Sequence, residues 1–519
     1  MPEHRNGLRS GFAAAAAMAA LAGLALPASA SPAPLVIGVE QGRLQGVGLD
    51  GGVSFRGVPF AAPPVGPLRW RPPAPARSWR GVRDATRFGL PCAQPDLGWN
   101  GVKTTGSSED CLTLNIWAPT AARGLPVMVW IHGGAFQGGS GVDPMFDGTA
   151  LMKHGVVVVT LNYRLGVLGF LAHPDLAAES AHHASGDYAF YDQAAALRWV
   201  QRNIARFGGD PRRVTLFGQS AGAASVGALM TSPLARGLFA RSIIESGPPF
   251  ALGDYKTAAQ AGEAVRDWGR IDDLRKLPVE ALLASWGRFV AADPGKRSAG
   301  PVVDGAIITR SPDVAFASGL ATPMASIVGN NSRESMGPPG PDALTRAFGA
   351  EADQARPYYG AVAADPVLGD GTSQLATDTV FRCPTVMTQA ARATSGNAVF
   401  AYQFEEPLPG RAAQGAGHSF ELPYVFGNMS PGGFLGGDFS PAERALSADM
   451  QAYWTNFAKR GDPNGPGLAP WGRFQPGGAA YMVLAAGRVG AREGLRAGPC
   501  ALYRRHWEKK HDQAGASRP

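Results

Sequence analysis

The chain lacks the residue patterns on which several large classes of protein depend. Only four of its 519 residues are cysteine, and no cysteines or histidines cluster at zinc-site spacing. The H-E-x-x-H motif and the phosphate-binding loop are absent. Basic residues do not interleave with aromatic residues as in nucleic-acid-binding chains. The sequence therefore indicates no metal, no cofactor and no nucleic-acid partner.

Charged residues are scarce, at 17% of the chain, whereas hydrophobic residues make up 45%. This balance favours a large packed core and argues against disorder. The net charge of +7 is spread along the chain, and the charged stretch YRRHWEKKH (503–511) is interpreted as a solvated terminal face. The length allows either several domains or one large domain with insertions.

One apolar run, GFAAAAAMAALAGLAL (11–26), is too short to span a bilayer comfortably. Arg5 and Arg9 precede it, and Ala28 and Ala30 follow at the small-residue positions of a cleavage site. We expect residues 1–30 to be a signal peptide, with a membrane anchor as the alternative. The mature chain is then exported, to the periplasm or the medium, and has no membrane span.

Export changes how the cysteines are interpreted, because disulfides are the default in an oxidising compartment. Three pairings of the four residues are possible, and buried free thiols are the alternative. The four residues are Cys92, Cys111, Cys383 and Cys500.

Strand and helix patterns alternate along the rest of the chain. PVMVWI (126–131) and GVVVVTLNY (155–163) are continuous β-branched runs, typical of strands buried on both faces of a parallel sheet. A helix is expected over 191–211, with Asp192 as its cap. We predict an α/β fold, one domain over 31–519, with a mostly parallel sheet flanked by helices. Segments near 250–325 and 335–380 are expected to cover a pocket.

A candidate nucleophile, Ser220, lies in GQSAG (218–222). In a chain this rich in glycine, a chance G-x-S-x-G occurs in about one of two such sequences. The context is more specific than the motif. A strand-like RVTLF (213–217) leads into the turn, and AGAASVGALM (221–230) continues as a helix, which is the setting of a nucleophile elbow.

A serine hydroxyl needs a base, and the base needs an acid to orient it. His418 follows the strand-like AVFAYQF (398–404) and comes last in the order serine, acid, histidine that such sheets use. A surface loop histidine is the alternative. Glu334 and Glu245 both follow strand-like runs, so spacing alone leaves two candidates for the acid.

Glycines after the strand PVMVWI supply candidate donors for an oxyanion. Gly133 and Gly134 can present bare backbone N–H groups, and the N–H of Ala221 begins the helix after the nucleophile. An ordinary glycine turn is the alternative. A second glycine motif, GVGLDG (46–51), matches a dinucleotide fingerprint, but a strand-like segment follows it, so we expect a hairpin there.

These segments together resemble the type-B carboxylesterases, which share the α/β-hydrolase fold with the cholinesterases. The similarity extends from about residue 35 to about residue 508. It is clearest in FGGDPRRVTLFGQSAG (207–222), EDCLTLNI (109–116), LNYRLGVLGFL (161–171) and GHSFELPYVFG (417–427). One departure is Gln219, where many members carry glutamate. The missing charge argues against a cationic choline substrate.

The resemblance implies a serine carboxylesterase that acts on a small-molecule ester and water through an acyl-enzyme. It implies Ser220 as nucleophile, His418 as base and Glu334 as acid, and it places the oxyanion hole at Gly133, Gly134 and Ala221. It also implies the disulfides Cys92–Cys111 and Cys383–Cys500. The same machinery could cleave a specialised ester, a carbamate or an amide. A non-catalytic binding protein on the same fold is the rival from another class, and such proteins typically lose a triad residue.

Overall fold

The central strands bury both of their faces, because apolar side chains alternate between two cores. In strand β7 (Leu125–Ile131), Val127 and Val129 belong to one core, and Met128 and Trp130 belong to the other. This pattern needs cover on both sides of the sheet. The structure is a computed structural model. It describes residues 35–516 apart from 100–103, 253–254, 295–298, 335–336, 338, 361, 431–433, 476 and 479.

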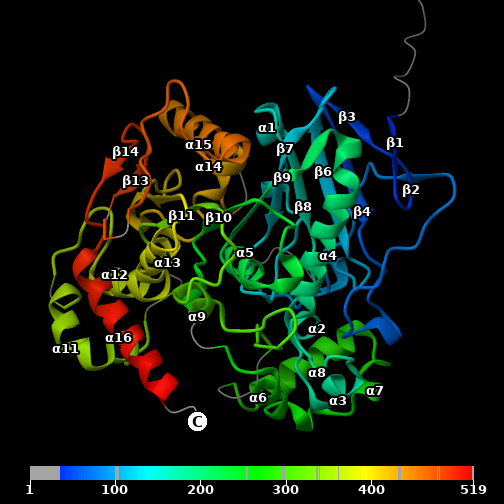
Figure 1. The fold of residues 1–519 in the computed structure, drawn as a ribbon, viewed down its shortest axis with the longest axis horizontal. Coiled ribbons are helices and arrows are strands. Elements are labelled where there is room, and N and C mark those ends of the chain that lie inside the picture. The colour runs from blue at the N-terminus through cyan, green and yellow to red at the C-terminus, as the bar shows by residue number, and fades with distance from the viewer. Residues whose placement is uncertain are drawn as a thin grey trace, which may run out of the picture. The chain divides into compact units, whose positions relative to one another are not determined.

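Eleven strands form one sheet, in the order β14-β13-β12-β11-β10-β9-β7-β8-β6-β4-β3 (Figure 1). The neighbouring pairs from β13 to β8 are parallel, and the pairs at the two ends are antiparallel. The expected mostly parallel sheet is confirmed. Besides β7, its strands are β3 (Val47–Leu49), β4 (Gly52–Pro59), β6 (Thr113–Pro119), β8 (Val157–Leu161), β9 (Gly209–Gln219), β10 (Arg241–Glu245), β11 (Ala325–Asn331), β12 (Val399–Phe404), β13 (Tyr481–Leu484) and β14 (Gly490–Arg492).

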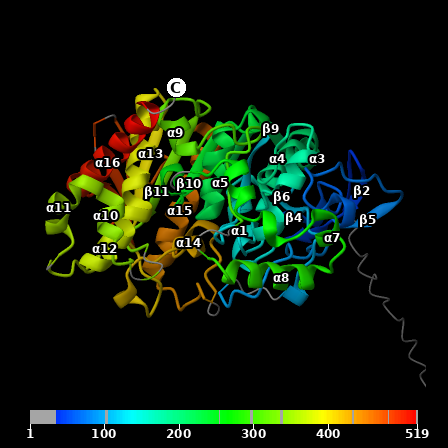
Figure 2. The ribbon, with the colours of Figure 1, turned by 90° about the horizontal axis from the view of Figure 1, so that it is seen from below.

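Helices cover both faces of this sheet, as Figure 2 shows. One face packs against α4 (Tyr188–Asn203), α5 (Ala221–Thr231) and α13 (Cys383–Thr394). The opposite face packs against α1 (Thr149–Lys153), α14 (Leu422–Phe426) and α15 (Pro441–Arg460). The result is the three-layer arrangement expected of the α/β-hydrolase fold.

Most of the remaining helices lie in the connections after β10 and β11, where the sequence predicted insertions. Whether these segments cover a pocket stays a prediction. They are α6 (Ala258–Glu263), α7 (Ile271–Leu274), α8 (Val279–Ala291), α9 (Pro312–Ala317), α10 (Ala343–Phe348), α11 (Ala352–Ala355) and α12 (Gly371–Thr377), and the others are α2 (Gly166–Phe170), α3 (Pro174–Glu179) and α16 (Ala497–Ala516).

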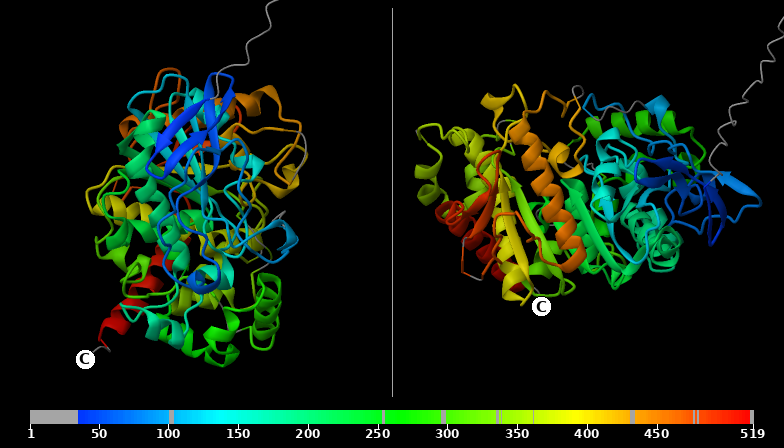
Figure 3. Two further views of the ribbon diagram at one scale, coloured as in Figure 1. Left: turned by 90° about the vertical axis from the view of Figure 1, so that its right-hand side faces the viewer. Right: turned by 90° about the horizontal axis from the view of Figure 1, so that it is seen from above.

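A second, three-stranded sheet is formed by β1 (Val36–Val39), β2 (Gly42–Gln45) and β5 (Val82–Asp84). Figure 3 shows it in blue, beside the β3–β4 end of the large sheet. The chain from Leu35 onward is one compact unit. The predicted signal peptide lies outside the described residues.

Two local predictions have different outcomes. GVGLDG is a hairpin turn as expected, because Leu49 pairs with Gly52 across the antiparallel strands β3 and β4. The predicted cap of the long helix was wrong. Helix α4 begins at Tyr188, after Asp187, and Asp192 lies fully buried within it. Its carboxylate instead binds Arg164, at 2.8 Å from Nε and 2.7 Å from Nη2.

Both disulfides implied by the resemblance are present. Cys92–Cys111 closes a short segment, with a separation of 19 residues. Cys383–Cys500 joins the start of α13 to α16 across a separation of 117 residues, which ties the C-terminal helix to the sheet's covering layer. All four cysteines are buried.

We expect the two disulfides to contribute unequally to the stability of the fold, because they close loops of different length. Replacing Cys383 and Cys500 together by serine is expected to lower the free energy of unfolding by about 5 kcal/mol, because the larger closed loop gains more chain entropy when opened. The matched replacement of Cys92 and Cys111 should cost about 3 kcal/mol. Urea denaturation monitored by circular dichroism measures both values. A larger loss for the Cys92–Cys111 pair would contradict the argument from loop length.

Candidate active site

Ser220 occupies the sharp turn between β9 and α5, with φ 55° and ψ −125°. Few residues other than glycine adopt a positive φ, so the surrounding backbone has to hold this conformation. The N–H of Ser220 donates to the carbonyl of Glu245 at 2.9 Å. Gly222 lets the turn approach β7, because a Cβ at that position would lie 2.0 Å from the carbonyl oxygen of Ile131.

His418 and Glu334 come into direct contact from loops that follow two neighbouring parallel strands. Glu334 follows β11, His418 follows β12, and Oε2 of the glutamate lies 2.6 Å from Nδ1 of the histidine. Glu334 is fully buried, and its Oε1 accepts the backbone N–H of Asn331 at 2.6 Å. Both carboxylate oxygens are therefore fixed by hydrogen bonds.

The charge on Glu334 also acts on the imidazole. Burial alone works to lower the pKa of His418. The hydrogen bond and negative charge of Glu334, together with the charge of Glu421, outweigh burial and raise that pKa above its ordinary value of 6.5.

Gln219 connects the serine turn to the histidine. Its Nε2 lies 3.3 Å from Nε2 of His418. An amide nitrogen can only donate, so Nε2 of the imidazole accepts. Nδ1 therefore carries the proton and donates a hydrogen bond to Glu334. In this tautomer Nε2 is unprotonated, so its lone pair can accept a proton once the contact with Gln219 opens.

The two acid candidates have different surroundings. Glu245 is also fully buried, but its Oε1 accepts from Nε1 of Trp454 at 2.8 Å. Of the two, Glu334 is the carboxylate that the structure brings to His418.

The glycine loop after β7 packs closely against the serine turn. A Cβ on Gly133 would lie 2.8 Å from the carbonyl oxygen of Gln219 and 3.1 Å from Cβ of Ser220, so only glycine fits there. The carbonyl of Gly134 accepts from the N–H groups of Gln137 and Gly138. Ala221, the third predicted donor, is the first residue of α5 and directly follows Ser220.

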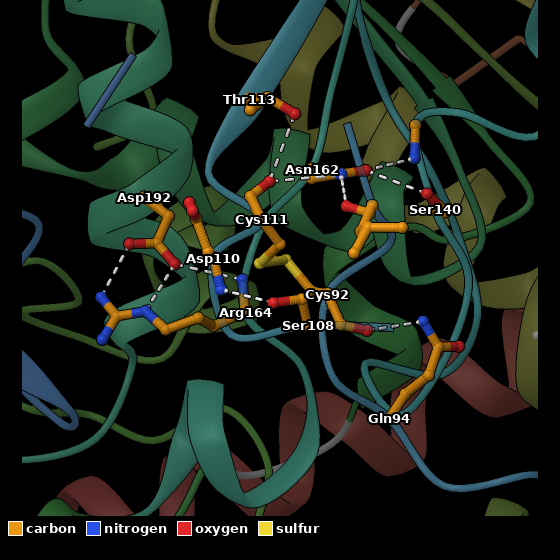
Figure 4. The surroundings of a disulfide bond; sticks show 12 residues. Cys92, Gln94, Ser108, Asp110, Cys111, Thr113, Ser140, Asn162, Arg164 and Asp192 are labelled. Carbon is orange, nitrogen blue, oxygen red and sulfur yellow. Dashed lines mark hydrogen bonds and ion pairs between the residues drawn. A yellow bond between two sulfur atoms is a disulfide. The ribbon is translucent and has the colours of Figure 1, made fainter. Parts of the chain in front are cut away.

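Residues near the first disulfide support this loop, as Figure 4 shows. The amide of Gln94 makes two hydrogen bonds to Gly139, both at 2.9 Å, and donates to the carbonyl of Cys92. Asn162 accepts from Ser140 at 3.0 Å and donates to the carbonyl of Cys111 at 3.2 Å. Sequence reasoning missed both amides. The segment LNYRLGVLGFL contains Asn162, but nothing local marked Gln94.

His132, at the start of the loop, is buried and is held uncharged. Burial lowers its pKa to about 4, although its hydrogen bond to the carbonyl of Gly133 opposes the shift. Its ring stacks on Tyr163 with centroids 4.4 Å apart, and the Tyr163 hydroxyl donates to the His132 carbonyl at 2.8 Å. An uncharged ring packed in this way is structural support for the loop.

A buried arginine binds the loop that follows β11 and carries Glu334 (residues 332–334, the acid loop). Arg382 ends a π-helical turn (Asp378–Arg382), and its Nη2 donates to the carbonyl of Ser332 at 2.5 Å. Its charge is balanced by Asp378, which also binds Arg496 at 2.8 Å. The acid loop is thus linked to the segment before α16.

Within the described residues, no group of three or more histidine, cysteine, aspartate or glutamate side chains could hold a metal ion. In the same part of the chain, no helix is both long and apolar enough to cross a lipid bilayer.

The chain belongs to the carboxylesterase family, whose profile matches residues 33–338 and 353–503. It is 40% identical over 493 residues to the fumonisin B1 esterase of Sphingopyxis macrogoltabida, covering 90% of this chain and 89% of that protein. It is 34% identical over 449 residues to the para-nitrobenzyl esterase of Bacillus subtilis, covering 83% of this chain and 90% of the relative. Such relatives support a carboxylic ester hydrolase.

Solved structures agree with this assignment. A PNB esterase superposes with a TM-score of 0.77 at 32% identity, over 90% of this chain and 99% of that one. A carboxylesterase of Geobacillus stearothermophilus gives a TM-score of 0.75 at 35% identity over the same shares. The α/β-hydrolase fold expected from the sequence is therefore confirmed.

The close approach at the serine turn predicts that Gly222→Ala disrupts the site. The added Cβ would lie 2.0 Å from a backbone oxygen that cannot move without β7, so we expect at least about a 100-fold loss of esterase activity and a lower melting temperature. Gly287→Ala is the matched control, because nothing lies within 4 Å of its Cβ in α8. In the control, the free energy of unfolding should rise by about 0.5–1 kcal/mol. An active, stable Gly222→Ala would contradict the described geometry.

Proposed function

We propose that this chain hydrolyses carboxylic esters through a triad of Ser220, His418 and Glu334 and an acyl-enzyme intermediate. The observation that carries the proposal is the 2.6 Å contact between Glu334 Oε2 and His418 Nδ1. A buried carboxylate on Nδ1 leaves Nε2 as the base and stabilises the imidazolium that forms. Membership of the carboxylesterase family supports the same chemistry.

In the first half-reaction, Oγ of Ser220 attacks the ester carbonyl carbon while its proton passes to Nε2 of His418. The carbonyl electron pair moves to oxygen, and the N–H groups of Gly133, Gly134 and Ala221 stabilise the resulting charge. Removing one such donor typically costs about 3–4 kcal/mol of barrier.

In the site without substrate, Gln219 contacts the imidazole nitrogen that has to accept the serine proton. Its amide donates to Nε2 of His418, so this contact has to yield before the imidazole can take the serine proton. Catalytic hydrogen bonds often tighten only when substrate is bound, which fits an exchange of this kind.

The intermediate then collapses, and the alkoxide leaves with the proton from Nε2 of His418. In the second half-reaction, His418 removes a proton from water as the water oxygen attacks the acyl carbon. The same donors stabilise the second oxyanion, and Ser220 leaves with the proton. The products are the carboxylic acid and the alcohol, and the enzyme returns to its starting state.

The same machinery could act on a specialised ester, a carbamate or an amide. The 40% identity to a fumonisin B1 esterase favours fumonisin B1 as one ester to test. A non-catalytic binding protein is disfavoured, because the serine, the histidine and the acid are all retained.

Ser220→Ala should abolish ester hydrolysis, because no other group can form the acyl-enzyme. Protein beginning at Ser31 is assayed on p-nitrophenyl esters from acetate to decanoate and on fumonisin B1. We expect kcat to fall by about 10⁴-fold or more. Ser395→Ala, at an exposed position after α13, is the control and should keep full activity. A Ser220→Ala variant that retains turnover on these esters would remove the proposed nucleophile.

The acid limb of the pH profile should report His418. Its pKa is raised above 6.5, so kcat/KM is expected to rise with pH through a value above 6.5 as the imidazole becomes neutral. Glu334→Gln removes the negative charge of Glu334, which helps to raise this pKa, so the limb should move to lower pH and kcat should fall by about 10³- to 10⁴-fold. Glu351→Gln, a buried carboxylate paired with Arg505 and Lys509, is the control. An unmoved limb in Glu334→Gln would argue against Glu334 as the partner.

A further inference from the structure

The loops that carry the proposed acid and base are joined by hydrogen bonds besides the one between their side chains. The backbone N–H of Arg333, the residue before the acid, donates to the carbonyl of Ala416 at 2.9 Å. Nδ2 of Asn331 donates to the carbonyl of Gly417, the residue before the histidine, at 2.7 Å. The acid loop is therefore attached along the segment 413–417, which leads into the histidine.

The side chain of Arg333 extends this attachment with all three of its guanidinium nitrogens. Nη1 donates to the carbonyl of Ala413 at 2.9 Å, in the segment before the histidine. Nε donates to the carbonyl of Val367 at 3.1 Å. Nη2 donates to the carbonyls of Asp365 and Pro366, at 3.1 and 2.8 Å. All four acceptors are backbone oxygens, and they come from two loops that are distant in the chain.

The turn 365–369, which supplies three of these carbonyls, is held in shape by its own hydrogen bonds. Oδ1 of Asp365 accepts the backbone N–H groups of Val367 at 2.7 Å and Leu368 at 2.8 Å. Backbone hydrogen bonds in both directions join Asp365 to Gly369. A turn closed in this way keeps its carbonyls in a fixed arrangement, so the arginine meets a preformed set of acceptors.

A glycine on each loop leaves room for the arginine side chain. Gly415 has φ 64°, and a Cβ there would lie 2.5 Å from Cδ of Arg333. Gly369 has φ 83°, and a Cβ there would lie 3.1 Å from Nε of the same arginine. Both backbones are in the left-handed region that favours glycine. The two loops thus approach the arginine closely at these two positions.

Arginine is the side chain that suits this arrangement. Its guanidinium is planar and rigid and has five N–H donors, whereas the ammonium of lysine is a compact point charge. Four carbonyls on two separate loops can be bound together only by a group that spans the distance between them. Backbone carbonyls carry no net charge, so the shape of the guanidinium matters here more than its charge.

We propose that Arg333 is a positioning residue for ester hydrolysis. Its guanidinium holds the acid loop against two other loops, and this sets the contact between Glu334 and His418. Because Arg333 directly precedes Glu334, a displacement of its backbone passes to the carboxylate. The 2.6 Å between Glu334 Oε2 and His418 Nδ1 leaves little tolerance for such a displacement. This role rests on the proposed function.

Two substitutions separate the shape of the side chain from its charge. Arg333→Lys keeps the charge and Arg333→Gln removes it, but neither side chain can bind four carbonyls. On p-nitrophenyl butyrate we expect kcat to fall by about 10- to 100-fold in both variants, with KM within about twofold of wild type. The hydrogen bond and charge of Glu334 raise the pKa of His418, so a loosened contact should move the acid limb of kcat/KM to lower pH in both.

Guanidinium ion tests the same role by rescue. Arg333→Ala removes the guanidinium from its place between the two loops while their carbonyls remain. Guanidinium chloride below denaturing concentrations should raise kcat of this variant several-fold and return the acid limb toward its wild-type position. Sodium chloride at the same concentration should do neither.

Arg213 of β9 provides a matched control, because it is also partly exposed and also binds backbone carbonyls. Its guanidinium donates to the carbonyl of Gly124 at 3.1 Å and to that of Lys459 at 2.9 Å. Arg213→Lys should lower the melting temperature but leave kcat and the acid limb unchanged.

Proton NMR detects the contact between the acid and the base without turnover. A proton on Nδ1 that is hydrogen-bonded closely to a carboxylate resonates far downfield, and Glu334→Gln should remove this signal. The signal should weaken or shift in Arg333→Lys and stay unchanged in Arg213→Lys. Turnover retained by Ser220→Ala would overturn the proposed triad, but the signal would still report whether Arg333 positions Glu334.

Three outcomes would overturn the inference. One is full kcat with an unmoved acid limb in both Arg333→Lys and Arg333→Gln, even at a lower melting temperature, because the arginine would then only stabilise the fold. Another is full activity in Arg333→Lys alone, since charge rather than shape would then matter. The third is an Arg333→Ala variant that sodium chloride restores as well as guanidinium chloride does.

Discussion

The close approach of backbone segments around Ser220 is the constraint on which the rest of the site depends. Cβ atoms at Gly222 and Gly247 would each lie 2.0 Å from a carbonyl oxygen, of Ile131 and of Ser220 respectively. A Cβ at Gly133 would lie 2.8 Å from the carbonyl oxygen of Gln219. Three segments therefore meet with no side chain between them. This contact fixes the serine, the glycine loop and the end of β10 as one unit, and it explains how a serine is held at positive φ.

Three acidic side chains at or after the ends of the strands are buried away from solvent. Glu245, Glu334 and Glu421 are all fully buried, and each has a specific donor: Trp454, the backbone of Asn331 and the side chain of Asn331. Trp454 comes from α15, which packs against the sheet, and Asn331 is the last residue of β11. Asn331 fixes both Glu334 and Glu421, whose charges raise the pKa of His418, so the electrostatics of the histidine depend on the end of β11.

Residues whose signal is local could be predicted from the sequence. Ser220 sits in a strand, turn and helix that are contiguous, and β7 and β8 appear as continuous apolar runs. Residues whose partner is distant in sequence could not be found this way. Gln94 contacts Gly139, 45 positions away, and Asn331 contacts Glu421, 90 positions away. Asp192 illustrates the same limit, because its position favoured a helix cap, whereas its partner Arg164 is 28 residues earlier and buries it in the core. Local propensity gives way to a buried ion pair there.

The ends of the large sheet have a consequence for how copies of the chain meet. The edge strands β3 and β14 are three residues each, and each is the outer arm of an antiparallel pair. A second chain that added a strand at either edge would find only a few unpaired backbone groups. The eleven-stranded sheet therefore presents almost no template for edge-to-edge growth, and its long, strongly hydrophobic strands are shielded from aggregation by their position in the middle.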